Sequence, residues 1–286
     1  MMPNAARVTF TKKKKTVACP VPLAPLADTH AHLLSFWGKE VPETLVRAKA
    51  AGVDLLVTMF DPIADKRSVT DYSDWLVREI LPMQDIPQIK YLAGVHPYGA
   101  PDYTDDVHAQ VVAALDDPLC AGIGEIGLDY YWDTSTKATQ EIMLRAQLEL
   151  ALELDLPVII HDREAHGDSL RIVCDYPGLR GVFHCFSGSV EMARELLRRG
   201  WYLGFDGPVT YKNARKTVEV ALECPLDRML LETDSPYMAP VPVRGTRNDS
   251  RSVRYIAEKL AALRGLDTDE LIRLTAENGK RLFGIG

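Results

Sequence analysis

Eight short apolar runs alternate with segments of helical pattern through most of this 286-residue chain. Most of the runs carry Val, Ile and Leu at successive positions, which is typical of strands buried on both faces. Strands that alternate with helices in this way, in a chain of this length, indicate an α/β fold of the (β/α)8 TIM-barrel type. The runs cover residues 26–34, 53–60, 89–97, 120–129, 157–162, 181–186, 201–207 and 229–234.

A doubly wound open sheet is the alternative fold for the same alternation. A Gly-x-Gly-x-x-Gly turn after one of the early runs would favour a dinucleotide-binding version of that sheet, and the sequence has none there. Between the runs, capping residues, prolines and glycines predict where helices begin and end. These signals place helices after Pro42, after Thr104, over 136–155, from Ser189 to Arg199, over 251–264 and after Asp267.

The alternation starts at Leu26, so we interpret residues 1–25 as an N-terminal extension to one domain over residues 26–286. The extension holds a lysine run, Lys12–Lys15, without the apolar segment that completes a signal peptide. A solvated surface is the favoured interpretation of this run, and an arm that binds nucleic acid is the alternative. No apolar stretch approaches ~18 residues, so no membrane-spanning helix and no membrane partner are expected.

The chain carries 33 basic and 40 acidic residues, which gives a net charge of −7. This balance argues against a protein that coats duplex DNA through a broad positive face, although a few arginines in one cleft can still bind phosphates. The cysteines are scattered and odd in number, which predicts reduced thiols in a cytoplasmic protein. They are Cys19, Cys120, Cys174, Cys185 and Cys224, of which Cys185 is expected to be a buried structural thiol rather than a nucleophile.

Ionisable residues gather at the predicted strands. Glu125 lies inside the fourth run and Asp234 ends the eighth. The carboxyl ends of barrel strands meet at one mouth, so residues that are far apart in sequence are expected to converge there. Five of the seven histidines lie within or at the end of a run, namely His30, His32, His96, His161 and His184.

These residue types predict a metal centre. His30 and His32 are two residues apart on a strand, so both imidazoles point to the same side and can bind one ion. Glu125 would be costly to bury unpaired, and its two oxygens can bridge two ions, whereas an ion pair with an inward-facing Arg or Lys is the alternative. Each remaining candidate, taken singly, also fits a core histidine or a turn residue.

The set of candidates is more informative than any one of them. Four histidines and two carboxylates exceed the needs of one tetrahedral site, but they suit a pair of ions that share a carboxylate. Such a pair, about 3.5–4 Å apart, can activate a hydroxide for attack on a phosphoryl or acyl group. Zn, Mn, Fe and Mg are compatible with nitrogen and oxygen ligands, Mg alone being the least natural with histidine.

The sequence around these residues resembles the TatD family of metal-dependent hydrolases, which belongs to the amidohydrolase-like barrels. The resemblance runs from about Leu26 to Phe283 and covers nearly the whole chain except the extension. The motifs that carry it are DTHAHL at 28–33, GVHPY at 94–98, GEIGLDYY at 124–131, HDREA at 161–165, FHCFSGS at 183–189, LLETDSPYMAP at 230–240 and RGTRND at 244–249.

The resemblance implies a TIM barrel with two divalent ions, Zn, Mn or Mg, at the C-terminal ends of the strands. It implies that Glu125 bridges the two ions and that Asp234 accepts and later donates the proton of the attacking water. The first ion would be held by His30, His32, Glu125 and Asp234. The second would be held by Glu125, His161 and His184.

The better-known members of the family are nucleases that act on DNA ends, often as 3′→5′ exonucleases on single strands. The resemblance therefore implies a cytoplasmic DNase that uses Mg or Mn and whose partner is single-stranded or end-frayed DNA. A monomer is compatible with this function.

Three residues are predicted to bind substrate, namely His96, Arg163 and Arg244. His96 ends the third run and could contact substrate or a water molecule. Arg163 and Arg244 could bind phosphate, and surface ion pairs are the alternative. Arg244 also opens a basic stretch, 244–254, which could contact a strand backbone or form a solvated loop and first helix turn.

Two departures from the family pattern are expected near the substrate mouth. Tyr98 stands where many members have a second His, and Asp249 and Ser250 stand where many have Glu and Pro. They leave open a two-metal hydrolase of a small amide, ester or phosphodiester. A non-enzymatic metal-bound scaffold is disfavoured because every implied ligand is present. Tyr131 and Trp132 could either stack a base or pack against the barrel rim.

Overall fold

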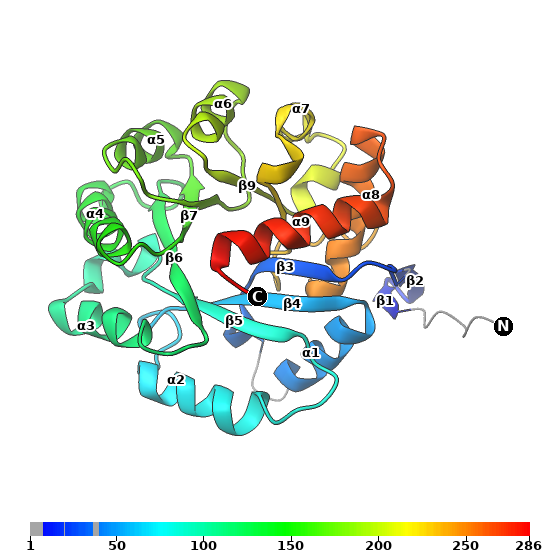
Figure 1. Ribbon diagram of the computed structural model, residues 1–286, viewed down its shortest axis with the longest axis horizontal. Helices are drawn as coiled ribbons and strands as arrows, with labels where there is room; N and C mark the ends of the chain where they lie inside the picture. The colour runs from blue at the N-terminus through cyan, green and yellow to red at the C-terminus, as the bar shows by residue number, and fades with distance from the viewer. Residues whose placement is uncertain (1–7, 20, 37–39) are drawn as a thin grey trace.

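Parallel strands form the centre of the protein in a computed structural model that describes residues 8–19, 21–36 and 40–286. Each strand of this sheet pairs with the next one along the chain, from β3 to β10 (Figure 1). This order confirms the predicted TIM barrel and excludes the open sheet whose strand order reverses. The strands are β3 (Leu26–Ala31), β4 (Val53–Phe60), β5 (Gln88–Ala93), β6 (Cys120–Asp129), β7 (Val158–Arg163), β8 (Gly181–Phe183), β9 (Tyr202–Phe205) and β10 (Met229–Leu231).

Contacts between β3 and the end of β10 bring the two edges of the sheet together. Thr29 Oγ1 donates to the Leu231 carbonyl at 3.0 Å. The backbone of Ala31 forms a parallel bridge with Ser235, and the His32 N–H donates to the Ser235 carbonyl at 2.8 Å. The sheet is therefore a nearly closed barrel, in which the first and last strands place their polar residues beside one another.

Helices surround the barrel, and the described part of the chain contains nine α-helices. Three of them, α2, α5 and α7, were not predicted. α2 has only seven residues, and α5 and α7 begin without a side-chain cap, unlike the equally short α6. The predicted caps Thr104, Ser189 and Asp267 each accept a backbone N–H at a helix start. The helices are α1 (Glu40–Ala50), α2 (Val69–Trp75), α3 (Asp105–Ala114), α4 (Lys137–Glu153), α5 (His166–Cys174), α6 (Val190–Arg198), α7 (Arg215–Glu223), α8 (Val253–Arg264) and α9 (Thr268–Phe283).

The interior of the barrel is filled by apolar side chains from alternate strand positions, such as Val57, Ile159 and Leu230. Phe283 and Ile285, at the end of the chain, belong to the same buried cluster. Figure 1 shows α9 crossing the strands and the C-terminus near their centre. The C-terminal segment therefore closes one end of the barrel, and the polar candidates lie at the other end.

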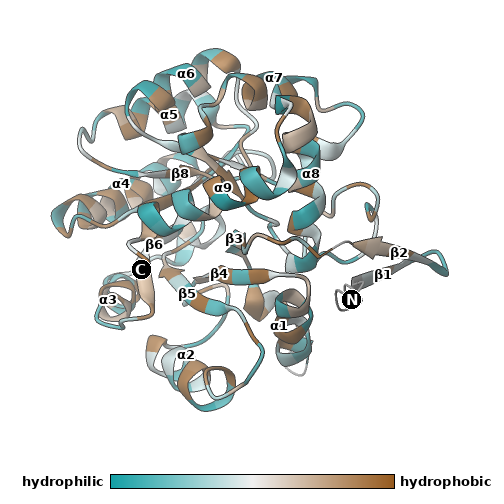
Figure 2. Ribbon diagram, turned by 45° about the vertical axis from the view of Figure 1, so that its right-hand side comes forward, coloured by the Kyte–Doolittle hydropathy of each residue, from teal (hydrophilic) through white to brown (hydrophobic). Residues whose placement is uncertain are grey.

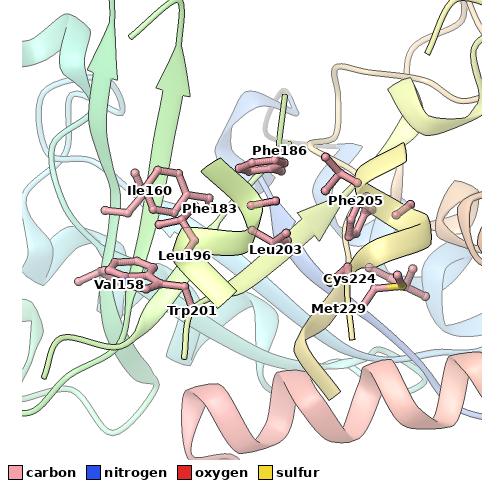
Figure 3. Close-up of a cluster of buried hydrophobic side chains, with 14 of the residues drawn as sticks. Val158, Ile160, Phe183, Phe186, Leu196, Trp201, Leu203, Phe205, Cys224 and Met229 are labelled. Carbon is pink, nitrogen blue, oxygen red and sulfur yellow. The ribbon is translucent and has the colours of Figure 1, made fainter. Parts of the chain in front are cut away.

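A second apolar layer lies between the strands and the helices. Phe183 and Trp201 meet at 5.3 Å between ring centroids, and Leu196 of α6 packs in the same cluster (Figure 3). Figure 2 shows hydrophobic and hydrophilic residues interspersed along the outer helices, as expected for helices with one buried side. Among the described residues, no helix combines the length and apolar character that a membrane span requires.

Part of the predicted extension is a folded hairpin. Strands β1 (Val8–Lys12) and β2 (Lys15–Cys19) pair antiparallel, and Lys13 and Lys14 form the turn with positive φ angles. Phe10 is buried beside Tyr255 of α8, and Figure 2 shows the hairpin at the edge of the barrel. The lysine run is thus mostly a solvated turn, while the domain boundary at residue 25 stays a prediction.

Five of the predicted strands are too long. The runs 26–34, 89–97, 181–186, 201–207 and 229–234 leave the sheet at Ala31, Ala93, Phe183, Phe205 and Leu231. Two residues of the loops that follow, Cys185 and Asp234, have φ of +43° and +52°, a conformation that no strand ladder accommodates. His32, His96, His184 and Asp234 therefore lie in loops just beyond the strands rather than within them.

Candidate functional site

The six predicted metal ligands converge at the carboxyl-terminal mouth of the barrel around one carboxylate, Glu125 in β6. Its Oε2 atom lies 3.4 Å from Nε2 of both His30 and His32. Its Oε1 atom lies 2.6 Å from His161 Nδ1 and 2.7 Å from His184 Nε2. The two oxygens of one buried carboxylate thus face two different pairs of imidazoles.

Asp234 joins the first of these pairs. Its Oδ1 atom lies 3.2 Å from His32 Nε2 and 3.7 Å from His30 Nε2. The backbone N–H of Asp234 donates to the His30 carbonyl at 2.9 Å, so the closure of the barrel holds this carboxylate in place. The candidate metal ligands around Glu125 therefore form two groups. His30, His32 and Asp234 lie on the side of β3 and β10, and His161 and His184 lie on the side of β7 and β8.

Close packing of the strands allows this convergence. A Cβ atom on Gly127 would lie 1.9 Å from the His161 carbonyl oxygen, and the residue has a φ of +151°. A Cβ atom on Gly204 would lie 2.4 Å from Oε2 of Glu232, a buried carboxylate at the end of β10. Glycine at these two positions therefore permits β6 to approach β7 closely and leaves room for the Glu232 carboxylate beside β9.

The histidines differ in protonation because their neighbours differ. Burial and the nearby His184 lower the pKa of His30 to about 4. Burial opposes protonation of His32 too, but Asp234 and Glu125 outweigh it and raise its pKa to about 9. Burial likewise opposes protonation of His161, but Asp129 and Glu125 raise its pKa to about 10. Without an ion, protons on His32 and His161 balance the charge of the carboxylates.

Asp129, at the end of β6, supports His161 from outside the cluster. Its Oδ2 atom lies 3.1 Å from His161 Nε2 and accepts a 2.7 Å hydrogen bond from the Tyr98 hydroxyl. Burial would raise the pKa of Asp129, but the hydrogen bonds from His161 and Tyr98 lower it to about 2. A carboxylate on the far nitrogen of an imidazole fixes the ring so that the other nitrogen is available to an ion.

Further carboxylates lie buried beneath the cluster. Asp28, Asp206 and Glu232 are at most 2 % exposed, and burial raises the pKa of each. Asp206 Oδ2 and Glu232 Oε2 have no hydrogen-bond partner among the described residues. No lysine or arginine in the described part of the chain forms an ion pair with these three residues. Divalent cations fit this site, because they can replace the protons that the imidazoles and the buried carboxylates hold in the absence of an ion.

His96 faces the same centre from the loop after β5. Its Nδ1 atom accepts the Tyr98 backbone N–H at 3.2 Å, and its Nε2 atom lies 3.9 Å from Glu125 Oε1. Burial and the nearby His161 lower the pKa of His96 to about 3, so the imidazole is neutral. Because Nδ1 accepts a hydrogen bond, Nε2 carries the proton and points to the centre as a donor. This geometry suits contact with a substrate or water oxygen better than ligation.

A cavity of about 1300 Å³ opens over the cluster, and Arg163 and His96 are both on its wall. Arg163 lies with its guanidinium 3.8 Å from the ring centroid of Tyr131. Cys185 also lines the cavity, and it is half-buried rather than fully buried as expected. Its positive φ angle places it in a turn just beyond the end of β8. Burial and nearby carboxylates raise the pKa of its thiol, which disfavours a nucleophilic thiolate.

The predicted basic stretch, 244–254, lies outside the cavity. Arg244 stacks 3.9 Å from the ring centroid of Tyr211, so its predicted contact with phosphate has no support from the cavity wall. The other arginines of the stretch, Arg247, Arg251 and Arg254, form ion pairs with Glu40, Asp249 and Glu258, respectively. Their charges stabilise the fold around α8 rather than extend a positive surface.

The two departures from the family pattern separate in space. Tyr98 lines the cavity, as expected. Asp249 is buried away from the cavity, contrary to expectation, because its carboxylate pairs with Arg251 at 2.6 Å and accepts that residue's backbone N–H. Arg251 in turn donates to the Thr9 carbonyl of the hairpin at 2.7 Å. The change at Asp249 therefore concerns packing of the hairpin. Ser250 is also buried and forms a hydrogen bond with Asp28 beneath the cluster.

Sequence reasoning missed Asp129, Glu232 and Asp206 as parts of the site. Each is an acidic residue at or just after the end of an apolar strand, which is the same signal that identified Asp234. The sequence does not reveal which of several strand-end carboxylates lies among the imidazoles and which contacts an imidazole on the side away from the cluster.

Comparison with known proteins agrees with this geometry. The family model described as "TatD related DNase" matches residues 27–284. The chain is 40% identical over 263 residues to "Uncharacterized metal-dependent hydrolase YabD" of Bacillus subtilis, covering 91% of this chain and 99% of the relative. It is 32% identical over 256 residues to "3'-5' ssDNA/RNA exonuclease TatD" of Citrobacter rodentium, covering 86% and 93%.

A solved structure of the same family has the same fold. The crystal structure of YJJV, a TatD homolog from Escherichia coli K12, superposes with a TM-score of 0.79 at 28% sequence identity. The alignment covers 91% of this chain and 98% of that one. The family match, the relatives and the fold agree over nearly the same residues. The chain therefore belongs to the TatD family.

Proposed function

We propose that the protein is a metal-dependent phosphodiesterase that removes nucleotides from the 3′ end of single-stranded or end-frayed DNA. The observation that carries the proposal is the position of the Glu125 carboxylate. Its two oxygens face separate pairs of imidazoles beneath an open cavity. That geometry suits a carboxylate shared by two ions. The relative from Citrobacter rodentium, named a 3′–5′ ssDNA/RNA exonuclease, supports the choice of substrate.

The proposal assigns each side of the cluster to one divalent ion, Zn, Mn or Mg. On the β3 and β10 side the ligands are His30, His32, Glu125 and Asp234. On the β7 and β8 side they are Glu125, His161 and His184. Two ions, when bound there, act as Lewis acids on the phosphoryl group and lower the pKa of water.

The side chains perform the proton transfers and the positioning. Asp234, on the cavity wall, accepts the proton that the attacking water loses as its oxygen bonds to phosphorus. The P–O3′ bond breaks, and Asp234 returns the proton to the 3′-oxygen of the shortened strand. His96 donates a hydrogen bond from Nε2, and Arg163 offers its guanidinium to a phosphate on the same wall. The thiols of Cys120, Cys174, Cys185 and Cys224 are free, which suits the reducing cytoplasm in which such an enzyme would act.

The test is a time course on an oligonucleotide labelled at its 5′ end, in single- and double-stranded form, with Mg and Mn in turn. We expect a metal-dependent ladder of shortened strands from the wild type and none from Glu125→Ala. Glu153→Ala, an exposed carboxylate on α4, is the matched control and should cleave like the wild type. Absence of cleavage by protein that holds its metal would refute the DNase proposal.

A small substrate is the second candidate, and the charge of the cavity favours it. Outside the cluster the wall carries four acidic residues, Asp61, Asp65, Asp162 and Glu164, against two arginines, Arg67 and Arg163. A long polyanion gains little there from electrostatic attraction. Turnover of small esters, amides or phosphodiesters well above that of oligonucleotides would establish this alternative, which uses the same ligands.

A further inference from the structure

Two aromatic side chains stand largely exposed on the wall of the cavity. Trp132, just after β6, is 70% exposed, and Tyr98, after β5, is 53% exposed. Both line the cavity that opens over the histidine cluster. Because each side chain keeps half or more of its surface exposed, each leaves a large apolar area on the cavity wall available for contact with a ligand.

Arg163 lies beside both aromatic residues. Its guanidinium is 3.8 Å from the ring centroid of Tyr131 and 5.8 Å from that of Trp132. Arg163 also lies close to the Tyr98 hydroxyl. Burial raises the pKa of that hydroxyl, and the positive charge of Arg163 partly offsets the increase. Tyr131 does not line the cavity and packs edge-on against Trp132 at 4.6 Å. Tyr131 is itself 51% exposed and lies against Arg163 beside the cavity, whereas Tyr98, Trp132 and Arg163 line the cavity wall.

Tyr98 is held in a fixed orientation close to the reacting centre. Its hydroxyl donates to Asp129 at 2.7 Å, and its ring packs edge-on against His96 at 4.5 Å. Asp129 in turn contacts His161 at 3.1 Å. Through Asp129, the Tyr98 hydroxyl is therefore connected to His161, a candidate metal ligand, by two successive contacts. A ring held rigidly loses little conformational entropy when it stacks on a ligand.

We propose that Tyr98, Trp132 and Arg163 form a nucleobase-stacking subsite for the nucleotide next to the scissile phosphodiester. Planar bases stack on aromatic rings with little dependence on their identity, and a guanidinium adds attraction to both the ring and the phosphate. The inference rests on the proposed function and extends it, because it assigns binding to the base rather than to the backbone alone.

The experiment compares an oligodeoxynucleotide with the same strand carrying an abasic residue at the terminal or the penultimate position. We expect removal of the stacked base to raise KM by about 5- to 100-fold for the wild type, the range that one base–aromatic stack supplies. Trp132→Leu should raise KM for the intact strand to a similar extent and leave KM for the abasic strand unchanged. Trp132→Phe, which keeps a ring, should recover most of the affinity.

Equal effects of Trp132→Leu on intact and abasic strands, or a change in KM below twofold for both, would overturn the subsite. A second measurement needs no turnover: the binding of dAMP and of ribose 5-phosphate is measured by isothermal titration calorimetry, which does not depend on the fluorescence of Trp132. We expect dAMP to bind more tightly by a similar factor, and this preference should vanish in Trp132→Leu. Preference for dAMP in a protein that cleaves no DNA would refute the DNase proposal and retain the subsite. Cleavage of DNA by a protein that shows no preference for dAMP would support the DNase proposal and refute the subsite.

Discussion

Glu125 Oε1 lies 2.6 Å from His161 Nδ1, and the opposite nitrogen of that imidazole lies 3.1 Å from Asp129. In the absence of an ion, His161 thus stands between two carboxylates and holds a proton. A divalent cation has to displace that proton, and this exchange links the ligands, the pH and the stability of the protein.

Replacing Asp129 by Asn should weaken metal binding by about 10- to 100-fold, because the imidazole loses the carboxylate that orients it and raises its basicity. The measurement is a competition titration with a chromophoric chelator. Tyr98→Phe removes only the hydroxyl that donates to Asp129 and should have a smaller effect in the same direction. Unchanged affinity in Asp129→Asn would show that Asp129 does not act on His161.

Metal-free protein should lose stability as the pH rises from about 7 to about 10. The folded-state pKa values of His32, about 9, and His161, about 10, exceed the 6.5 of a free imidazole, so the folded state binds more protons in this range. Their contribution to stability is complete below pH 6.5 and is lost as the pH passes through 9 and 10. Thermal unfolding of chelator-treated protein at pH 6.5 and pH 9.5 measures it.

Metal-loaded protein is the control for that experiment. Bound ions replace the protons on the ligands, so its Tm should exceed that of the metal-free form and the difference should grow over the same range of pH. A Tm that is the same with and without metal would contradict the idea that the buried carboxylates need cations.

His96→Ala should lower kcat by about 100-fold, the scale of one hydrogen-bond donor to a transition-state oxygen, while the metal content stays the same. The protonated Nε2 atom and the 3.9 Å separation from Glu125 are the basis for this expectation. Elemental analysis beside the kinetics separates the two possible roles, since loss of an ion with the imidazole would identify His96 as a ligand.

Phe283→Ala should lower the free energy of unfolding by about 3–5 kcal/mol, because it opens a cavity in the closed end of the barrel. The change lies at the opposite end from the histidine cluster, so metal content measured on folded protein should not change. Denaturant unfolding of the metal-free forms provides the comparison. A loss well below 1 kcal/mol would mean that the C-terminal segment does not contribute to the barrel core.

The alternation of apolar and helical segments indicated the barrel and left a doubly wound open sheet as the alternative, which the observed strand order excludes. The same reasoning missed the short helices α2, α5 and α7 and predicted five strands that are too long. Turns such as that at Cys185 depend on φ angles that the tertiary structure imposes, and apolar residues beyond a strand end look like more strand.

By itself the sequence determined the fold class and the set of residues whose chemistry suits metal ions, because both follow from residue type and spacing along one chain. The tertiary structure alone decided which oxygen of Glu125 faces which imidazoles, that Asp129 and Glu232 lie behind the ligands, and that Arg244 lies outside the cavity. These distances depend on the register between strands far apart in sequence and on how the barrel closes, and no local pattern encodes them.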